Sequence, residues 1–252
     1  MSVTLEGGCR VSDLMEGPAS AEGPLRVWRH VGRHVGAQAI SLRVVELNGG
    51  LSTELINTAC DEILYVFAGR GYISRGGIRD RIQPGTGIYL APGLSVKLDN
   101  DGSEPLVLIS AQCPEPVEQG NQFQTTTTPG TPAGKVGVVR FDERETVPTR
   151  DRWYRVLVNE DVGCTQVTQF IGSIPPGRAP DHQHDYEEVL VILQGQGRMW
   201  AGSASTQIET GSCVFLPRGQ VHCVENTGSD ELRLLGVFYP SGSPGPRNQR
   251  ES

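Results

Sequence analysis

The chain has 252 residues, a formal net charge of −7, 37% hydrophobic residues, 32 glycines and 17 prolines. This length suits one large domain or two of about 100 to 150 residues, and the many glycines and prolines favour short strands and turns over long helices. Lys and Arg form no cluster of the kind that binds a phosphate backbone, which argues against a nucleic-acid partner.

The N-terminal residues, MSVTLEGGCRVSDLMEGPAS, lack the basic start and apolar run of a signal peptide. No stretch approaches the roughly 18 apolar residues that cross a bilayer. We therefore expect a soluble, cytoplasmic protein with no membrane partner. Six cysteines stand at wide spacings without a CxxC motif, so six free thiols are expected, most of them buried.

In chain order, the sequence predicts at most a short helical turn near residues 11–15 and then many short strands. Runs such as 63–67 and 189–193 are rich in β-branched or aromatic residues and are closed by glycine. Turn residues recur about every 8 to 12 positions, which favours an all-β sandwich or barrel. A Thr/Pro/Gly-rich stretch within 115–134 is typical of a linker, and the tail 241–252 is expected to be flexible.

The second half of the chain repeats the first at a constant offset of 126 residues. Residues 61–71, DEILYVFAGRG, align without a gap with residues 187–197, EEVLVILQGQG. The same offset then pairs glycine with glycine at 85 and 211 and at 93 and 219. So many matches at one offset indicate a duplicated domain. We expect the two copies to pack as an intrachain pseudo-dimer, and the pattern leaves a homodimer open.

The residues with the clearest chemistry lie in the second copy. His182 and His184 are two positions apart, which on a strand points both imidazoles to one face. Glu188 follows four residues later, and His222 closes the segment GSCVFLPRGQVH. Three of the chain's five histidines thus fall close together in sequence, with a carboxylate among them.

Here the sequence resembles the cupin superfamily, and specifically a bicupin. The first cupin motif, G-x5-H-x-H-x3-4-E-x6-G, is similar to the segment from Gly177 to Gly195, with four residues in place of five before His182. The second motif, G-x5-P-x-G-x2-H-x3-N, is matched in full from Gly211 to Asn226.

The resemblance covers residues 36–114 and 135–240. It implies an all-β fold of two tandem cupin jelly-roll β-barrels related by internal duplication. The N-terminal barrel would take residues 1–114 and the C-terminal barrel residues 135–240, with 115–134 as the linker between them.

The resemblance also implies that His182, His184, Glu188 and His222 hold one divalent transition metal in the C-terminal barrel. Three imidazoles and one carboxylate leave one or two positions of an octahedron open, which suits Fe(II) or Mn(II) first and Ni(II) or Co(II) next. Zn(II) ranks lower, because structural zinc prefers four closed ligands with more thiolate.

The first copy lacks this ligand set. At the same offset, the three histidines fall on Ile56, Thr58 and Val96, and only Glu188 keeps a counterpart, Glu62. One carboxylate alone does not hold a transition metal against water. We therefore expect the N-terminal barrel to be metal-free and to serve in packing against its sibling.

Weaker inferences concern the neighbours of the site. Tyr186 precedes Glu188 and is a candidate hydrogen-bond donor to a substrate, or else a half-buried tyrosine at the barrel mouth. Glu187 should point away from Glu188 into solvent, because neighbouring residues on a strand alternate between faces. By the same rule Cys223 should face away from the metal.

Fold alone does not give the reaction, so three functions stay open. The first is an oxygen-dependent oxidoreductase that resembles small-molecule dioxygenases, with Glu188 and Tyr186 as catalytic residues. The second is an oxygen-independent isomerase, decarboxylase, lyase or hydrolase whose metal polarises a carbonyl or carboxylate. The third is a non-catalytic module that binds a small ligand. The intact ligand set favours an enzyme acting on a small organic molecule, and we rank the dioxygenase first.

Overall fold

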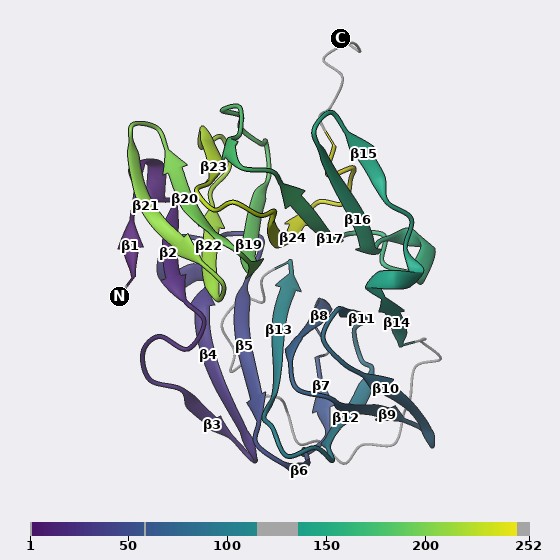
Figure 1. Cartoon of the computed structure of the whole chain (residues 1–252). Helices are drawn as coiled ribbons and strands as arrows, with labels where there is room; N and C mark the ends of the chain where they lie inside the picture. Colours follow the sequence, from purple (N-terminus) through teal and green to yellow (C-terminus); the bar gives the residue numbers. More distant parts are fainter. Residues whose placement is uncertain (1, 58, 115–135, 246–252) are drawn as a thin grey trace.

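The computed structural model describes residues 2–57, 59–114 and 136–245, so the predicted linker 115–134 and residues 246–252 of the tail lie outside the described residues. Strands make up most of the regular structure (Figure 1). The helices in the described ranges are single 3-10 turns, and none is long and apolar enough to cross a membrane. The helical turn predicted at 11–15 is wrong, because a strand occupies residues Arg10–Asp13.

The strands before the undescribed linker are β1 (Val3–Thr4), β2 (Arg10–Asp13), β3 (Ser20–Glu22), β4 (Leu25–Val31), β5 (Leu42–Leu47), β6 (Gly50–Leu51), β7 (Leu55–Ile56), β8 (Asp61–Ala68), β9 (Gly71–Arg75), β10 (Ile78–Ile82), β11 (Thr86–Leu90), β12 (Ser95–Asn100) and β13 (Leu106–Cys113). Those after it are β14 (Gly137–Arg140), β15 (Val147–Thr149), β16 (Arg152–Val158), β17 (Thr168–Ile174), β18 (Gly177–Arg178), β19 (Glu187–Gln194), β20 (Gln196–Ala201), β21 (Ala204–Glu209), β22 (Ser212–Leu216), β23 (His222–Asn226) and β24 (Leu232–Tyr239). The 3-10 turns are η1 (Glu6–Gly8), η2 (Arg33–Val35), η3 (Phe141–Glu143) and η4 (Glu160–Val162).

Each half of the chain forms one large and one small antiparallel sheet. The N-terminal pair has the strand orders β14-β11-β8-β13-β5-β4-β3 and β10-β9-β12-β6, with β7 also paired to β12. The C-terminal pair has the orders β1-β2-β22-β19-β24-β17-β16-β15 and β18-β23-β20-β21. Equivalent strands such as β8 and β19 hold equivalent places, and Figure 1 shows one barrel above the other. The predicted all-β fold of two tandem jelly-roll barrels related by duplication is confirmed.

The central strands of the large sheets are buried on both faces, which explains why they form continuous apolar runs rather than alternating ones. In β8, Leu64 and Val66 pack inside the N-terminal barrel. Ile63 and Tyr65 point the other way, into a second core that also contains residues of the C-terminal half. β19 repeats this arrangement, so one hydrophobic core lies between the two barrels.

The two halves also exchange a strand at each N-terminal end. β2 pairs with β22 of the C-terminal barrel, with Val11 opposite Val214. β14 pairs with β11 of the N-terminal barrel, with Val138 opposite Ile88. The C-terminal large sheet is therefore extended by the first two strands of the chain, β1 and β2, and the N-terminal large sheet by β14, the first strand after the undescribed linker.

The described part of the tail is bonded to the C-terminal barrel. The Ser241 hydroxyl donates to the backbone oxygen of Thr165 at 2.7 Å, and the Thr168 hydroxyl donates to the backbone oxygen of Gly242 at 2.9 Å. The start of the tail is therefore held against the C-terminal barrel at Ser241 and Gly242.

Two buried carboxylates reach across the core between the barrels. Glu187 accepts hydrogen bonds from the backbone N–H groups of Gln38 at 2.9 Å, Ala39 at 2.7 Å and Ile40 at 3.3 Å. Asp61, its equivalent at the 126-residue offset, accepts from the side-chain amide of Gln166 at 2.9 Å. The expectation that Glu187 is solvated is therefore wrong. It does point away from Glu188, but the space on that side is filled by the other barrel.

We predict that Glu187→Ala destabilises the whole chain. The substitution removes the acceptor of three backbone N–H groups of the N-terminal barrel, one of them on the buried Ile40, so the free energy of unfolding should fall by about 1 to 3 kcal/mol. Urea denaturation measures the change. Glu209→Ala, which removes an exposed carboxylate from the same barrel, should stay within about 0.5 kcal/mol of the wild type. Equal losses in the two variants would contradict the anchoring role.

Candidate metal centre

The three histidines come from two backbone segments that are hydrogen-bonded to each other. His182 and His184 lie in the irregular segment between β18 and β19, and His222 is the first residue of β23. The N–H of His182 donates to the oxygen of His222 at 3.0 Å, and the reverse bond measures 2.8 Å. The pair His182 and His184 is therefore not on a regular strand as the spacing suggested, but a single antiparallel bridge to His222 places it.

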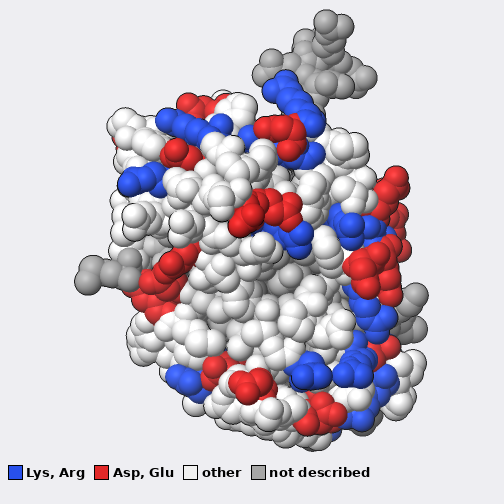
Figure 2. Space-filling model, in the orientation of Figure 1, with Lys and Arg blue, Asp and Glu red and all other residues white. Residues whose placement is uncertain are grey.

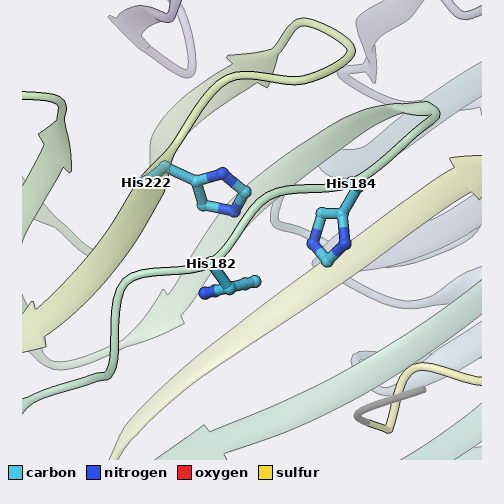
Figure 3. Close-up of side chains that lie close together, drawn as sticks. All are labelled: His182, His184 and His222. Atoms are coloured by element: carbon cyan, nitrogen blue, oxygen red, sulfur yellow. The ribbon is translucent and has the colours of Figure 1, made fainter. Parts of the chain in front are cut away.

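The three imidazole rings point into one shared space (Figure 3). One ring nitrogen from each of His182, His184 and His222 lies within 4.8 Å of the other two. The ring centroids of His182 and His222 are 4.4 Å apart. Groups that bind one common ion have this kind of arrangement.

Backbone carbonyls orient two of the rings. Nδ1 of His182 lies 3.1 Å from the oxygen of Pro180, and Nδ1 of His222 lies 2.8 Å from the oxygen of Gln220. A carbonyl oxygen only accepts, so each Nδ1 carries the hydrogen and each Nε2 keeps its lone pair. Such bonds fix the tautomer that a metal requires.

Burial keeps these imidazoles neutral. It lowers the pKa of His222 to about 3, and the neighbouring His182 adds to the effect. Burial also lowers the pKa of His182, while the charges of Glu188 and Arg152 act on that ring in opposite directions. Two lone pairs are therefore available at neutral pH without the loss of a proton.

Glu188 lies beside this cluster, on the inner face of the barrel. It is the second residue of β19 and is 5% exposed, and its Oε2 lies 3.4 Å from Nε2 of His184. In the part of the chain that the structure describes, no Lys or Arg forms an ion pair with it. A buried carboxylate without a cation is costly, so the pocket lacks one positive charge.

The N-terminal barrel shows how the same carboxylate is neutralised without a metal. Glu62, equivalent to Glu188, forms a buried ion pair with Arg43 at 2.7 Å. It also accepts hydrogen bonds from Ser110 at 2.7 Å and Gln112 at 3.2 Å.

The C-terminal barrel lacks all three of these partners. At the positions that the strand register makes equivalent to Arg43, Ser110 and Gln112 it has Phe170, Gly236 and Phe238. The fixed guanidinium is therefore absent where the histidines are present. A bound cation would take its place, so the donor set fits a divalent metal.

The histidine positions of the N-terminal barrel are apolar. Val96 is 1% exposed and belongs to the interior core of that barrel. Ile56 pairs with Ser95 on β12. The remaining equivalent position, Thr58, lies outside the described residues.

Tyr186 is part of an aromatic wall beside the histidines. Its ring is buried and stacks on His184, with centroids 4.6 Å apart and planes 7° apart. Its other face stacks on Phe238 at 4.7 Å, and Phe238 contacts Phe170. This stacking restrains the His184 ring, so Tyr186 has a structural role beside the site. That Tyr186 donates a hydrogen bond to a substrate stays a prediction.

Other neighbours divide between the two faces of the small sheet. Met199 lies in the interior core. Trp200 lies on the other face, where the guanidinium carbon of Arg178 is 4.3 Å from the centroid of the indole ring. The Arg178 Nε also donates to the sulfur of Cys223 at 3.2 Å. Cys223 therefore faces away from the histidines.

Sequence reasoning missed the absence of the arginine and did not settle whether Phe238 lines the pocket. Both follow from a comparison of the two copies: Gln112 aligns with Phe238 at the 126-residue offset, and Arg43, opposite Ser110, corresponds to Phe170, opposite Gly236. Comparing the non-motif positions of the two copies is the signal that finds them.

Comparisons with known proteins match this architecture. Residues 170–238 match the family model of the cupin domain. The chain is 35% identical over 67 residues to the oxalate-binding protein of Thermotoga maritima, covering 26% of this chain and 55% of that protein. It is 27% identical over 105 residues to the quercetin 2,3-dioxygenase of Bacillus subtilis, covering 41% and 31%. It is 28% identical over 86 residues to auxin-binding protein 1 of Arabidopsis thaliana, covering 30% and 43%. The chain thus spans about half or less of these relatives.

Solved structures align over nearly the whole chain. A putative glyoxylate-induced protein from Pseudomonas aeruginosa superposes with a TM-score of 0.76 at 17% identity, covering 98% of this chain and 95% of that one. A Bacillus subtilis oxalate decarboxylase variant superposes with a TM-score of 0.71 at 13% identity, covering 92% and 78%. At these identities the likeness concerns the fold. Residues 170–238 are thus similar to the cupin domain, and the two barrels share the fold of these solved structures.

Proposed function

We propose that this chain is a metal-dependent enzyme that binds one divalent transition metal through His182, His184, Glu188 and His222 and acts on a small organic molecule. The observation that carries the proposal is the buried Glu188, which lies beside the cluster of three imidazoles and has no Arg in the position of Arg43. When bound, the metal would supply a Lewis acid with one or two open positions for a substrate and for dioxygen.

We place an oxygen-dependent oxidoreductase first. The ligand set suits Fe(II) or Mn(II) best, and the quercetin 2,3-dioxygenase among the relatives supports this reaction class. The aromatic wall of Tyr186 and Phe238 gives the histidine cluster an apolar side, which suits a small organic substrate.

An oxygen-independent reaction on a small carboxylate is the second candidate. Two comparisons favour it, the oxalate-binding protein of Thermotoga maritima and the oxalate decarboxylase from Bacillus subtilis. Oxygen uptake by the Fe(II)-loaded or Mn(II)-loaded chain, measured with an electrode across a panel of flavonols and small carboxylates, separates the two. Turnover that continues unchanged under argon would exclude the dioxygenase.

The first prediction concerns metal content. Elemental analysis of the metal-loaded chain should give about one transition metal per chain, because only one barrel has the donor set. His222→Ala should lose most of the metal. Val96→Ala, the matched change in the other barrel, should leave metal content unchanged, and two metals per wild-type chain would contradict the vacancy of the N-terminal barrel.

The second prediction concerns Glu188. Glu188→Gln keeps the size of the side chain but removes its charge, so a general base at this position would be lost. The rate per bound metal should then fall by about 10² to 10⁴ with much of the metal retained. If Glu188 serves only as a ligand, metal content and activity should instead fall in proportion. Unchanged metal and unchanged activity would mean that Glu188 is not the fourth ligand.

A further inference from the structure

The segment that carries His222 is enclosed by the N-terminus of the chain. Residues 217–222 connect β22 to β23, and this loop also touches the second histidine segment, since the N–H of Gly219 donates to the oxygen of His184 at 2.7 Å. The oxygen of Gln220 accepts from Nδ1 of His222. Any shift of this loop therefore moves two of the three imidazoles.

The N-terminal segment 5–13 packs against this loop and the strand before it. β2 extends the sheet beside β22, and Cys9 is fully buried in the interior core of the C-terminal barrel together with Leu216 and Val224. Burial raises the pKa of the Cys9 thiol to about 12, so it stays an uncharged core residue.

Two glycines allow the close approach of this segment to the loop. Gly7 has φ +65°, and a Cβ built on it would lie 1.5 Å from Oε1 of Gln220. Gly8 has φ +86°, and its Cβ would lie 3.6 Å from the ring of Pro217. A side chain at position 7 would therefore displace the side-chain amide of Gln220, whose Nε2 donates to the backbone oxygen of Val221, next to His222, at 2.8 Å.

A second contact reaches the same loop from its other end. The Glu6 carboxylate accepts from the backbone N–H of Ser203 at 3.2 Å. The adjacent N–H of Gly202 donates to the oxygen of Val221, next to His222, at 3.0 Å. The turn η1 thus contacts Gln220 directly and Val221 through the β20–β21 turn.

We infer that the N-terminal turn η1, with Glu6 and Gly7, is a positioning element of the metal site 200 residues further along the chain. The inference rests on the proposed metal site and extends it to residues that belong, by sequence, to the metal-free half. It acts through the loop 217–222 by holding Gln220 and Val221, so that the His222 ring is fixed before a metal binds. Groups that orient metal ligands in this way contribute about 10- to 100-fold to metal affinity.

The test is Gly7→Val in the full-length chain, with Mn(II) as the probe in isothermal titration and chelator competition. Valine at position 7 meets Gln220, so Mn(II) affinity should fall at least tenfold. Gly17→Val is the matched control, because Gly17 also has a positive φ of +81° in the same N-terminal region but has no atom within 4 Å of its Cβ. It should carry the same backbone strain and bind Mn(II) like the wild type.

Rescue separates positioning from general damage. In Gly7→Val combined with Gln220→Ala the collision is gone, so most of the affinity should return, while the melting temperatures of the metal-free single and double variants report on folding. Wild-type affinity in Gly7→Val, an equal loss in Gly17→Val, or no rescue would each overturn the inference. If Gly7→Val fails to fold, Gly7→Ala and Gly17→Ala give the same comparison. A wild-type chain that binds no Mn(II), Fe(II) or Co(II) would instead overturn the metal site itself.

Discussion

A carboxylate inside a small apolar barrel has to be paired with a positive charge, and the two halves of this chain meet that requirement in different ways. In the N-terminal barrel Arg43 lies 2.7 Å from Glu62, with both side chains almost fully buried. In the C-terminal barrel Glu188 is equally buried, but among the described residues it has no Lys or Arg as an ion-pair partner, and Nε2 of His184 lies 3.4 Å from its Oε2. Desolvating an unpaired carboxylate costs several kcal/mol, which is the physical reason for proposing a bound cation in the place that the arginine takes in the other barrel. The three imidazoles of His182, His184 and His222 are the proposed further ligands.

Inside the N-terminal barrel Arg43 meets this requirement for Glu62. With the charge of the glutamate balanced by a side chain, the interior needs no further ligand at the positions equivalent to the histidines. Val96 can then join the apolar core of that barrel. Ser110 and Gln112 complete the hydrogen bonding of Glu62. The interior carboxylate of this barrel is therefore neutralised by its own side chains, and its outer face packs against the C-terminal barrel. Figure 2 shows the outside of the molecule, where acidic and basic side chains of the described residues are interspersed on the face in view.

The sequence predicts the features of this structure that depend on motifs and on the internal repeat, but not the contacts between the two barrels. The two cupin motifs and the 126-residue repeat predict the barrels, and the structure brings His182, His184 and His222 together. The face of each strand residue was harder to predict, because alternation shows that Glu187 and Glu188 point oppositely but not what each face meets. Glu187 was expected in solvent, yet it anchors the other barrel through Gln38 and Ala39. A motif records the ligands of a site, whereas the contacts that hold two domains together leave no fixed spacing in the chain.

The pairing of β2 with β22 and of β14 with β11 makes each barrel depend on the other half of the chain. Because β2 belongs by sequence to one half and by hydrogen bonding to the other, the C-terminal sheet has an unpaired edge at β22 without the N-terminal half. That edge leads directly into the loop that holds His222, so the same strand that satisfies the sheet also supports the ligand segment. The apolar core between the barrels and the buried Glu187 then fix the position of β2 relative to the rest of the N-terminal half. These contacts lie outside the histidine positions of both copies, so they hold the two barrels together independently of any metal bound in either one.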